Sequence, residues 1–149
     1  MQRRGEVLVI DDVIAIVEEL VTLLSWHEVG AHGATNLTDA LEVLTECPEI
    51  RVVACDVRLD RESGLDIIPR ILEHPELRRR PFRFLFMSGD PMQVQHFPAA
   101  SEHYILTKPV QPRVLMRAIT SMLGPDADPE FGNDREAQGA QSIGASPHV

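Results

Sequence analysis

The sequence predicts an α/β fold built around one doubly wound, five-stranded and mainly parallel sheet. Short apolar runs rich in Val, Ile, Leu and Phe recur along the chain, as expected for strands that are buried on both faces. Segments with apolar residues at helical spacing alternate with these runs. Such alternation is typical of parallel strands that are joined by right-handed helical crossovers.

Five strands are predicted, at residues 7–10, 28–31, 51–55, 82–87 and 104–107. The first is entirely Val, Leu and Ile, which favours a central position in the sheet. The second is weaker, because it holds few large apolar residues. The other four stop at polar or charged residues, which mark the beginning of loops.

The first two helices have recognisable start signals. Helix 13–25 follows Asp12, which is placed to act as its N-cap and to accept backbone donors. Helix 37–45 follows Asn36 and, three residues later, Asp39, a pair that resembles a capping box. Strand and helix therefore alternate twice within the first third of the chain.

The remaining helices differ in how clearly they are marked. Residues 63–66 open a third helix, and Pro112 suits the first turn of the last helix. A helix at 92–97 is poorly marked and lies between two prolines. The residues predicted to face inward are Ile67, Ile68, Ile71 and Leu72 in the third helix, and Val114 or Leu115, Ala118, Ile119 and Met122 in the last.

Five polar residues follow predicted strands at the point where each strand ends. They are Asp11, Asp12, Asp56, Ser88 and Lys108. Because the carboxyl ends of parallel strands lie at one edge of the sheet, we expect these side chains to converge on one shallow site. Lys108 is the only lysine among 14 basic residues, so no other position supplies a flexible ammonium group.

The three aspartates indicate a divalent cation and phosphate chemistry. Gathered carboxylates repel one another, and a hard cation relieves that repulsion. Magnesium, or manganese in its place, favours oxygen ligands and commonly binds one or two carboxylates together with phosphate oxygens. Asp56 is then a candidate nucleophile for phosphoryl transfer, with Lys108 and the Ser88 hydroxyl holding the phosphoryl oxygens.

An Asp-Asp pair, a single Asp, a Ser and a Lys-Pro after successive strands resemble the signature of the receiver domains of two-component response regulators. The resemblance covers residues 6–123 and implies a flavodoxin-like sheet of order 2-1-3-4-5 with helices on both faces. It implies that Asp12, Asp56 and the backbone carbonyl of Arg58 bind the metal directly. It further implies that Asp11 acts through metal-bound water.

The same resemblance implies a switch, and the sequence departs from the family there. In the family a Ser or Thr, here Ser88, moves toward the phosphoryl group, and an aromatic residue three positions before the lysine turns inward. This chain has Ile105 at that position, and Tyr104 should face the opposite side of the strand. We therefore expect a smaller switch. Asp60 also replaces the family's usual proline in the loop after Asp56.

Arg58 and Asp90 carry opposite charges on loops that flank the predicted pocket. A salt bridge between them would roof the pocket as an access gate and slow hydrolysis of the phosphorylated state. The alternative is that both side chains point into solvent, as loose surface charges often do.

The resemblance implies a signalling phosphoacceptor rather than an enzyme acting on other substrates. The expected phosphoryl donor is a sensor histidine kinase or a histidine phosphotransfer protein, which in the family docks on the first helix. Some of the apolar residues at that helix start should then be surface contacts, although all could instead be core. These residues are Val13, Ile14, Ile16 and Val17.

Two rival functions stay open at the level of sequence. An aspartyl-phosphate phosphohydrolase generally needs a second aspartate two residues after the nucleophile, where this chain has Arg58. A pseudo-receiver would keep the fold as a pure interaction module, but the complete acidic pair and Lys108 argue against it.

Composition limits the wider context. A formal charge of −9 argues against direct nucleic-acid binding, and without a membrane-spanning or secretory segment we expect a cytoplasmic protein. Cys47 and Cys55 are interpreted as reduced thiols without a special role, and the six histidines show no metal-ligand spacing. Residues 124–149 are poor in large apolar residues, which predicts a disordered tail or a linker to an output domain. The receiver would pass its signal either to such a linked output domain or to a separate downstream protein.

Overall fold

A five-stranded parallel sheet forms the centre of the protein in a computed structural model that describes residues 5–90 and 103–124. Its strands are β1 (Gly5–Ile10), β2 (Gly30–Ala34), β3 (Val52–Asp56), β6 (Arg83–Ser88) and β7 (His103–Thr107). Their order is β2-β1-β3-β6-β7, and every neighbouring pair is parallel. The predicted order 2-1-3-4-5 is confirmed.

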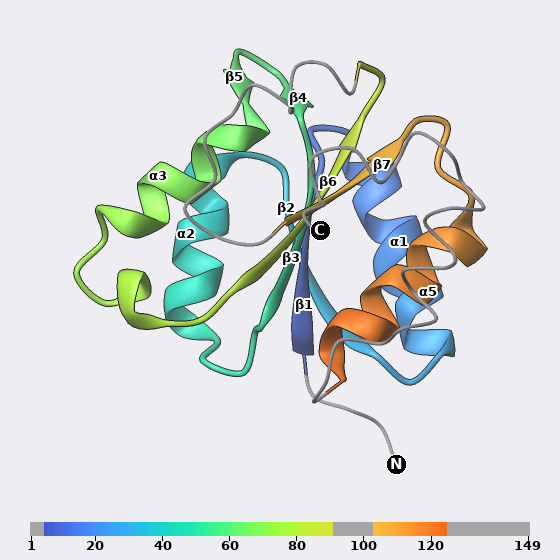
Figure 1. Ribbon diagram of the computed structural model, residues 1–149, viewed down its shortest axis with the longest axis horizontal. Helices are drawn as coiled ribbons and strands as arrows, with labels where there is room; N and C mark the ends of the chain where they lie inside the picture. The colour runs from blue at the N-terminus through green and yellow to red at the C-terminus, as the bar shows by residue number, and fades with distance from the viewer. Residues whose placement is uncertain (1–4, 91–102, 125–149) are drawn as a thin grey trace.

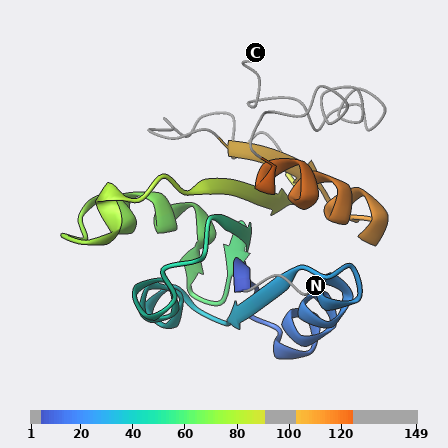
Figure 2. The same ribbon diagram turned by 90° about the horizontal axis from the view of Figure 1, so that it is seen from below.

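Helices cover both faces of this sheet, as predicted for a doubly wound fold. Their bounds are α1 (Ile14–Trp26), α2 (Leu37–Glu46), α3 (Ile67–Leu72) and α5 (Pro112–Leu123), with 3-10 turns at η1 (Gly64–Asp66) and η2 (Leu77–Arg79). Figures 1 and 2 show α1 and α5 on one face and α2 and α3 on the other. The helix predicted at 92–97 lies outside the described residues, as does the segment 125–149. No helix in the described ranges is long and apolar enough to span a bilayer.

Side chains alternate between two hydrophobic cores along each strand. In β1, Leu8 and Ile10 join the core under α2 and α3, whereas Val7 and Val9 join the core under α1 and α5. Near the end of the sheet, Ile105 is buried in the first core. Tyr104 packs against the second, so the two residues face opposite sides of β7 as expected from the period of a strand.

The start of α1 differs from its prediction. The helix begins at Ile14 with Val13 as N-cap, and no side chain caps it there. Instead, Asp11 Oδ1 accepts a hydrogen bond of 2.9 Å from the backbone N–H of Val13. The assignment of Asp12 as N-cap is therefore wrong, because the preceding carboxylate takes the backbone donor and Asp12 stays exposed.

β2 lies two residues later than its prediction of 28–31. Strand pairing with β1 depends on backbone hydrogen bonds and not on large apolar side chains, so the weak pattern misplaced it. A glycine in β2 also serves packing. A β-carbon at Gly33 would lie 2.2 Å from Val17 Cγ1, so the missing side chain lets the buried Val17 of α1 approach the strand.

The start of α2 and the inner face of α5 follow their predictions. Asn36 Oδ1 accepts from the backbone N–H of Asp39 at 2.8 Å, and Asn36 Nδ2 donates to Asp39 Oδ2 at 3.1 Å. The buried residues of α5 include Leu115, Ala118, Ile119 and Met122, while Val114 is only partly buried.

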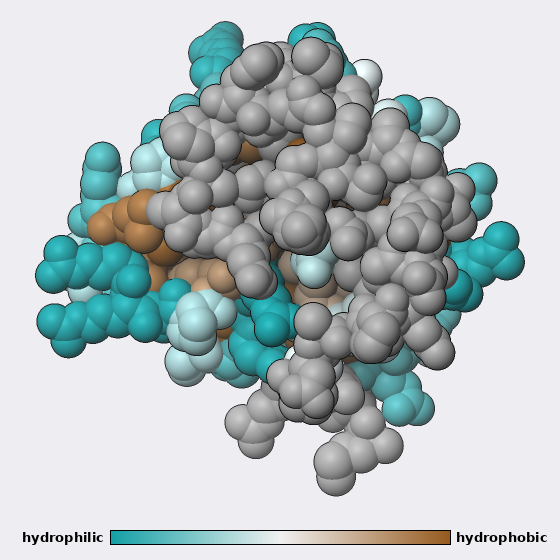
Figure 3. All heavy atoms as spheres, viewed as in Figure 1, coloured by the Kyte–Doolittle hydropathy of each residue, from teal (hydrophilic) through white to brown (hydrophobic). Residues whose placement is uncertain are grey.

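The third helix buries Ile67, Ile68 and Ile71 as predicted, but not Leu72. Leu72 is the last residue of α3 and is 43% exposed. On the face drawn in Figure 3, apolar side chains gather over α3 with hydrophilic side chains projecting around them.

A small antiparallel hairpin follows β3 and was not predicted. It consists of β4 (Arg58–Leu59) and β5 (Glu62–Ser63). Glu62 Oε2 accepts from the N–H of Leu37 at 2.9 Å, which ties the hairpin to the start of α2. At its end, Gly64 N donates to Val57 O at 2.6 Å, so the chain returns directly behind the end of β3.

Gly64 should be intolerant of a side chain. A β-carbon there would lie 2.0 Å from the carbonyl oxygen of Asp56 and 2.7 Å from Cys55 Sγ. We expect Gly64→Ala to lower the free energy of unfolding by about 2 to 3 kcal/mol in urea denaturation, because the backbone behind Asp56 must shift. Gly89→Ala is the matched control, since nothing lies within 4 Å of its added carbon. Equal stabilities for the two variants would contradict this packing.

Candidate functional site

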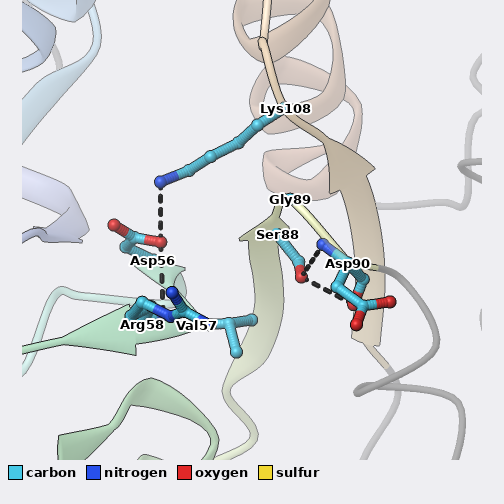
Figure 4. A pocket seen from close by; sticks show the side chains of 7 residues that line it. All are labelled: Asp56, Val57, Arg58, Ser88, Gly89, Asp90 and Lys108. Atoms are coloured by element: carbon cyan, nitrogen blue, oxygen red, sulfur yellow. Dashed lines mark hydrogen bonds and ion pairs between the residues drawn. The ribbon is translucent and has the colours of Figure 1, made fainter.

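Asp56 is the last residue of β3 and is only 5% exposed. Two donors reach its Oδ1 atom. Lys108 Nζ lies 2.9 Å away, and the backbone N–H of Arg58 lies 3.3 Å away (Figure 4). The lysine is anchored at the other end of its side chain, because its backbone N–H donates to Ser88 O at 2.8 Å. A buried carboxylate thus meets a cation that stays partly accessible to solvent.

Three carboxylates meet at this edge of the sheet. Oxygen atoms of Asp11, Asp12 and Asp56 all lie within 4.8 Å of one another. Burial raises the pKa of Asp11, and the charge of Asp56 raises it further, whereas the hydrogen bond from Val13 and the charge of Lys108 lower it. Buried and exposed carboxylates in one oxygen-rich cluster are a donor set that suits magnesium or manganese.

A pocket of about 370 Å³ opens beside these residues, between the ends of β3, β6 and β7. Its lining residues are Asp56, Val57, Arg58, Ser88, Gly89, Asp90 and Lys108 (Figure 4). The pocket and the acidic cluster share Asp56, so all five polar residues that follow the strands lie at one edge of the sheet. Their convergence is the outcome expected from parallel topology.

The Ser88 hydroxyl is engaged with its own loop. Its Oγ atom donates to the carbonyl oxygen of Asp90 at 2.9 Å and accepts from the backbone N–H of Asp90, also at 2.9 Å. Figure 4 shows this pair of bonds apart from the contact between Lys108 Nζ and Asp56. Any contact between this hydroxyl and a group on Asp56 would require these bonds to be exchanged.

Arg58 and Asp90 both line the pocket and are exposed. No ion pair joins these two side chains among the residues that the structure describes. The predicted roof is therefore not closed in this structure, and the access gate stays a prediction. Ile105 lies beneath this edge with 1% exposure, and the Lys108–Pro109 peptide bond is cis.

Sequence reasoning missed several residues that shape the site. Val57 lines the pocket, and Gly64 supports Asp56 from behind. Glu62 holds the hairpin between them against α2. A glycine eight residues after the end of a buried strand is a signal that could have indicated the close return of the chain, but its position alone does not distinguish a close approach from an ordinary turn.

Comparison with known proteins places this site in a family. The family model of the response regulator receiver domain matches residues 7–120. Among curated protein sequences, none matches significantly.

Solved structures of receivers resemble the chain closely in fold. One is the signal receiver domain of an HD domain-containing protein from Pseudomonas fluorescens Pf-5, with 25% identity, a TM-score of 0.66, and coverage of 81% of this chain and 95% of that one. The chemotaxis response regulator CheY4 of Vibrio cholerae has 20% identity and a TM-score of 0.66, covering 81% and 100%. TrrA of Thermotoga maritima, solved in complex with Mg²⁺ and BeF, has 19% identity and a TM-score of 0.66, covering 83% and 100%.

The family match spans most of the chain and includes the acidic pair, Asp56, Ser88 and Lys108. The sheet order and the edge at which these residues meet agree with that assignment. The chain therefore belongs to the response regulator receiver domain family, the phosphoacceptor modules of two-component signalling.

Proposed function

We propose that this chain accepts a phosphoryl group onto Asp56 from a sensor histidine kinase or a histidine phosphotransfer protein, in a reaction that depends on magnesium or manganese. The observation that carries the proposal is the contact of 2.9 Å between Lys108 Nζ and Asp56 Oδ1 at the edge of the acidic cluster. The receiver would comprise residues 6–123, act in the cytoplasm, and pass its signal to a downstream protein or to an output domain linked through residues 124–149.

The transfer is a displacement at phosphorus. A carboxylate oxygen of Asp56 attacks, so that a P–O bond forms while the P–N bond of the donor phosphohistidine breaks. The electron pair of that bond leaves with the imidazole, which then takes up a proton from solvent. Lys108 lies where its charge offsets the negative charge of the phosphoryl oxygens, and its anchored backbone keeps it there.

Asp11, Asp12, Asp56 and the backbone carbonyl of Arg58 would hold the divalent ion, with Asp11 acting through bound water. When bound, the ion supplies positive charge to the phosphoryl oxygens and screens the carboxylates from one another. Asp11 and Asp12 differ in exposure, so the buried carboxylate is a fixed part of the site and the exposed one meets solvent.

Phosphorylation would be sensed through Ser88. A phosphoryl oxygen on Asp56 is a stronger acceptor than a backbone carbonyl, because it is charged. It would draw the Ser88 hydroxyl away from its present acceptor, the carbonyl oxygen of Asp90. Ile105, already packed in the core with 1% exposure, has no ring to rotate into a vacated space, which supports a smaller switch than an aromatic residue would give.

The start of α1 offers a docking surface for the phosphoryl donor. Val13, Ile14 and Ile16 are 47%, 56% and 38% exposed, whereas Val17 is buried. The alternative that all four residues belong to the core is therefore wrong, because α1 turns only Val17 toward β2. Three exposed apolar side chains beside Asp12 support contact with a donor protein.

Asp56→Asn should abolish phosphorylation and leave the fold intact, because an amide is a poor nucleophile of nearly the same shape. The measurement is acid-labile phosphate bound after incubation with acetyl phosphate and magnesium. Asp60→Asn is the matched control, since Asp60 is an exposed carboxylate on the following hairpin. Acid-labile phosphate on Asp56→Asn at the level of the control would contradict the assignment.

The access gate can be tested through the lifetime of the phosphorylated state. If Arg58 and Asp90 together restrict the path of water to phosphorus, Arg58→Ala and Asp90→Ala should speed decay of the aspartyl phosphate to a similar extent. The double variant should decay no faster than either, because the two residues act as one unit. Arg78→Ala, an exposed arginine of η2, is the control. Unchanged decay in both single variants would exclude the gate.

A further inference from the structure

A second group of metal-ligating side chains lies outside the phosphorylation pocket. A ring nitrogen of His32, the sulfur of Cys47 and a carboxylate oxygen of Glu49 all lie within 4.8 Å of one another. His32 belongs to β2, Cys47 is the C-cap of α2, and Glu49 lies in the turn before β3. Because that turn leads into the amino end of β3, the group sits toward the edge of the sheet opposite Asp56.

One atom of this group lacks a partner in the structure. His32 Nε2 is buried, and no hydrogen bond reaches it from the described part of the chain. Glu49 Oε2 is the nearest charged atom, at 3.8 Å, which is too long for a hydrogen bond. A buried polar atom without a partner costs stability, so the position of this nitrogen calls for a ligand.

Packing fixes the His32 ring in this position. A β-carbon at Gly5 would lie 2.2 Å from Nε2 and 2.5 Å from Cδ2, so the ring occupies the space that a side chain on β1 would need. The ring is therefore held between the start of β1 and the end of α2. Its exposed edge and the exposed part of Glu49 leave the group open to small ions from solvent.

We propose that His32, Cys47 and Glu49 form a binding site for zinc, with a water molecule as the fourth ligand. Imidazole, thiolate and carboxylate are the ligands that zinc prefers, and three protein ligands with one open position are a common zinc arrangement. Bonds of about 2.0 to 2.3 Å place tetrahedral ligand atoms roughly 3.3 to 3.7 Å apart. The separation of 3.8 Å between Nε2 and Oε2 is close to that range, so small rotations of the Cys47 and Glu49 side chains toward the fixed His32 ring complete the site.

The charges around the site favour a cation on balance. The carboxylates of Glu49 and Glu46 both lie close enough to Cys47 to act on it by their charge, and both attract a cation. Arg80 opposes them with one positive charge, and its guanidinium donates to the carbonyl oxygens of Leu44, Cys47 and Ile50. On binding, the Cys47 proton leaves to solvent and a Zn–S bond forms.

Zinc at this position would join three parts of the fold. It would link edge strand β2 to the end of α2 and to the turn before β3. An ion that binds only the folded state stabilises it by mass action. The cluster of Asp11, Asp12 and Asp56 offers only oxygen ligands. A bond between the bound ion and a thiolate would therefore show that the ion occupies the site at Cys47 and not the acidic cluster.

Cobalt(II) tests the proposal directly, because it replaces zinc and gives a charge-transfer absorption band when a thiolate binds it. We expect the full chain, in excess magnesium, to bind one cobalt ion with this band and to lose the ion to zinc. Cys47→Ser should abolish the band. Cys55→Ala should retain it, because Cys55 is buried beside Asp56 and burial strongly raises the pKa of its thiol.

Carboxylate and imidazole variants separate the site from binding elsewhere. Glu49→Gln and His32→Gln should each weaken zinc binding by at least about tenfold, as losses of ligand-supporting residues commonly do. Glu46→Gln, a neighbouring carboxylate outside the group, should bind as the wild type does. Zinc should also raise the melting temperature of the Asp12→Ala variant, whose acidic cluster is incomplete. Absence of the band in the wild type, or equal zinc affinity of Glu49→Gln and Glu46→Gln, would overturn the proposal.

Discussion

The crowding of negative charge at one edge of the sheet is the constraint on which the site depends. Parallel topology brings three carboxylates within 4.8 Å, and the only lysine of the chain reaches one of them at 2.9 Å. At Asp11, burial raises the pKa of the carboxyl group, and the charge of Asp56 raises it further. The fold thus holds an arrangement that is costly without positive charge and is relieved by a divalent ion or by Lys108.

Close packing and hydrogen bonds hold Asp56 and Lys108 in place. Gly64 allows the chain to return behind Asp56, and Glu62 fastens the intervening hairpin to α2. On the other side, the backbone of Lys108 is bonded to that of Ser88. Asp56 is therefore held between neighbours on two sides. The loop from Ser88 to Asp90 is closed by two hydrogen bonds of the Ser88 hydroxyl, and a charged acceptor on Asp56 would compete for that hydroxyl.

The sheet order followed from the family resemblance. The meeting of Asp11, Asp12, Asp56, Ser88 and Lys108 followed from the sequence pattern, because the carboxyl ends of parallel strands lie at one edge of the sheet. The pattern was not sufficient where two donors or acceptors compete locally. Asp11 rather than Asp12 takes the backbone donor before α1. The approach of His32 to Cys47 was also invisible, because it depends on how β2 packs against the end of α2 and not on any spacing in the sequence.

The central claim is that the acidic pocket is a working phosphoryl site rather than a preserved shape. Amide chemical shifts measured with magnesium, with beryllofluoride, and with both together test it most directly, because beryllofluoride imitates a phosphoryl group on aspartate. We expect large shifts at Asp56, Ser88 and Lys108 only when both are present, with smaller shifts extending along β7 to Ile105. Spectra that stay unchanged in the combined condition would contradict it and would favour a pure interaction module.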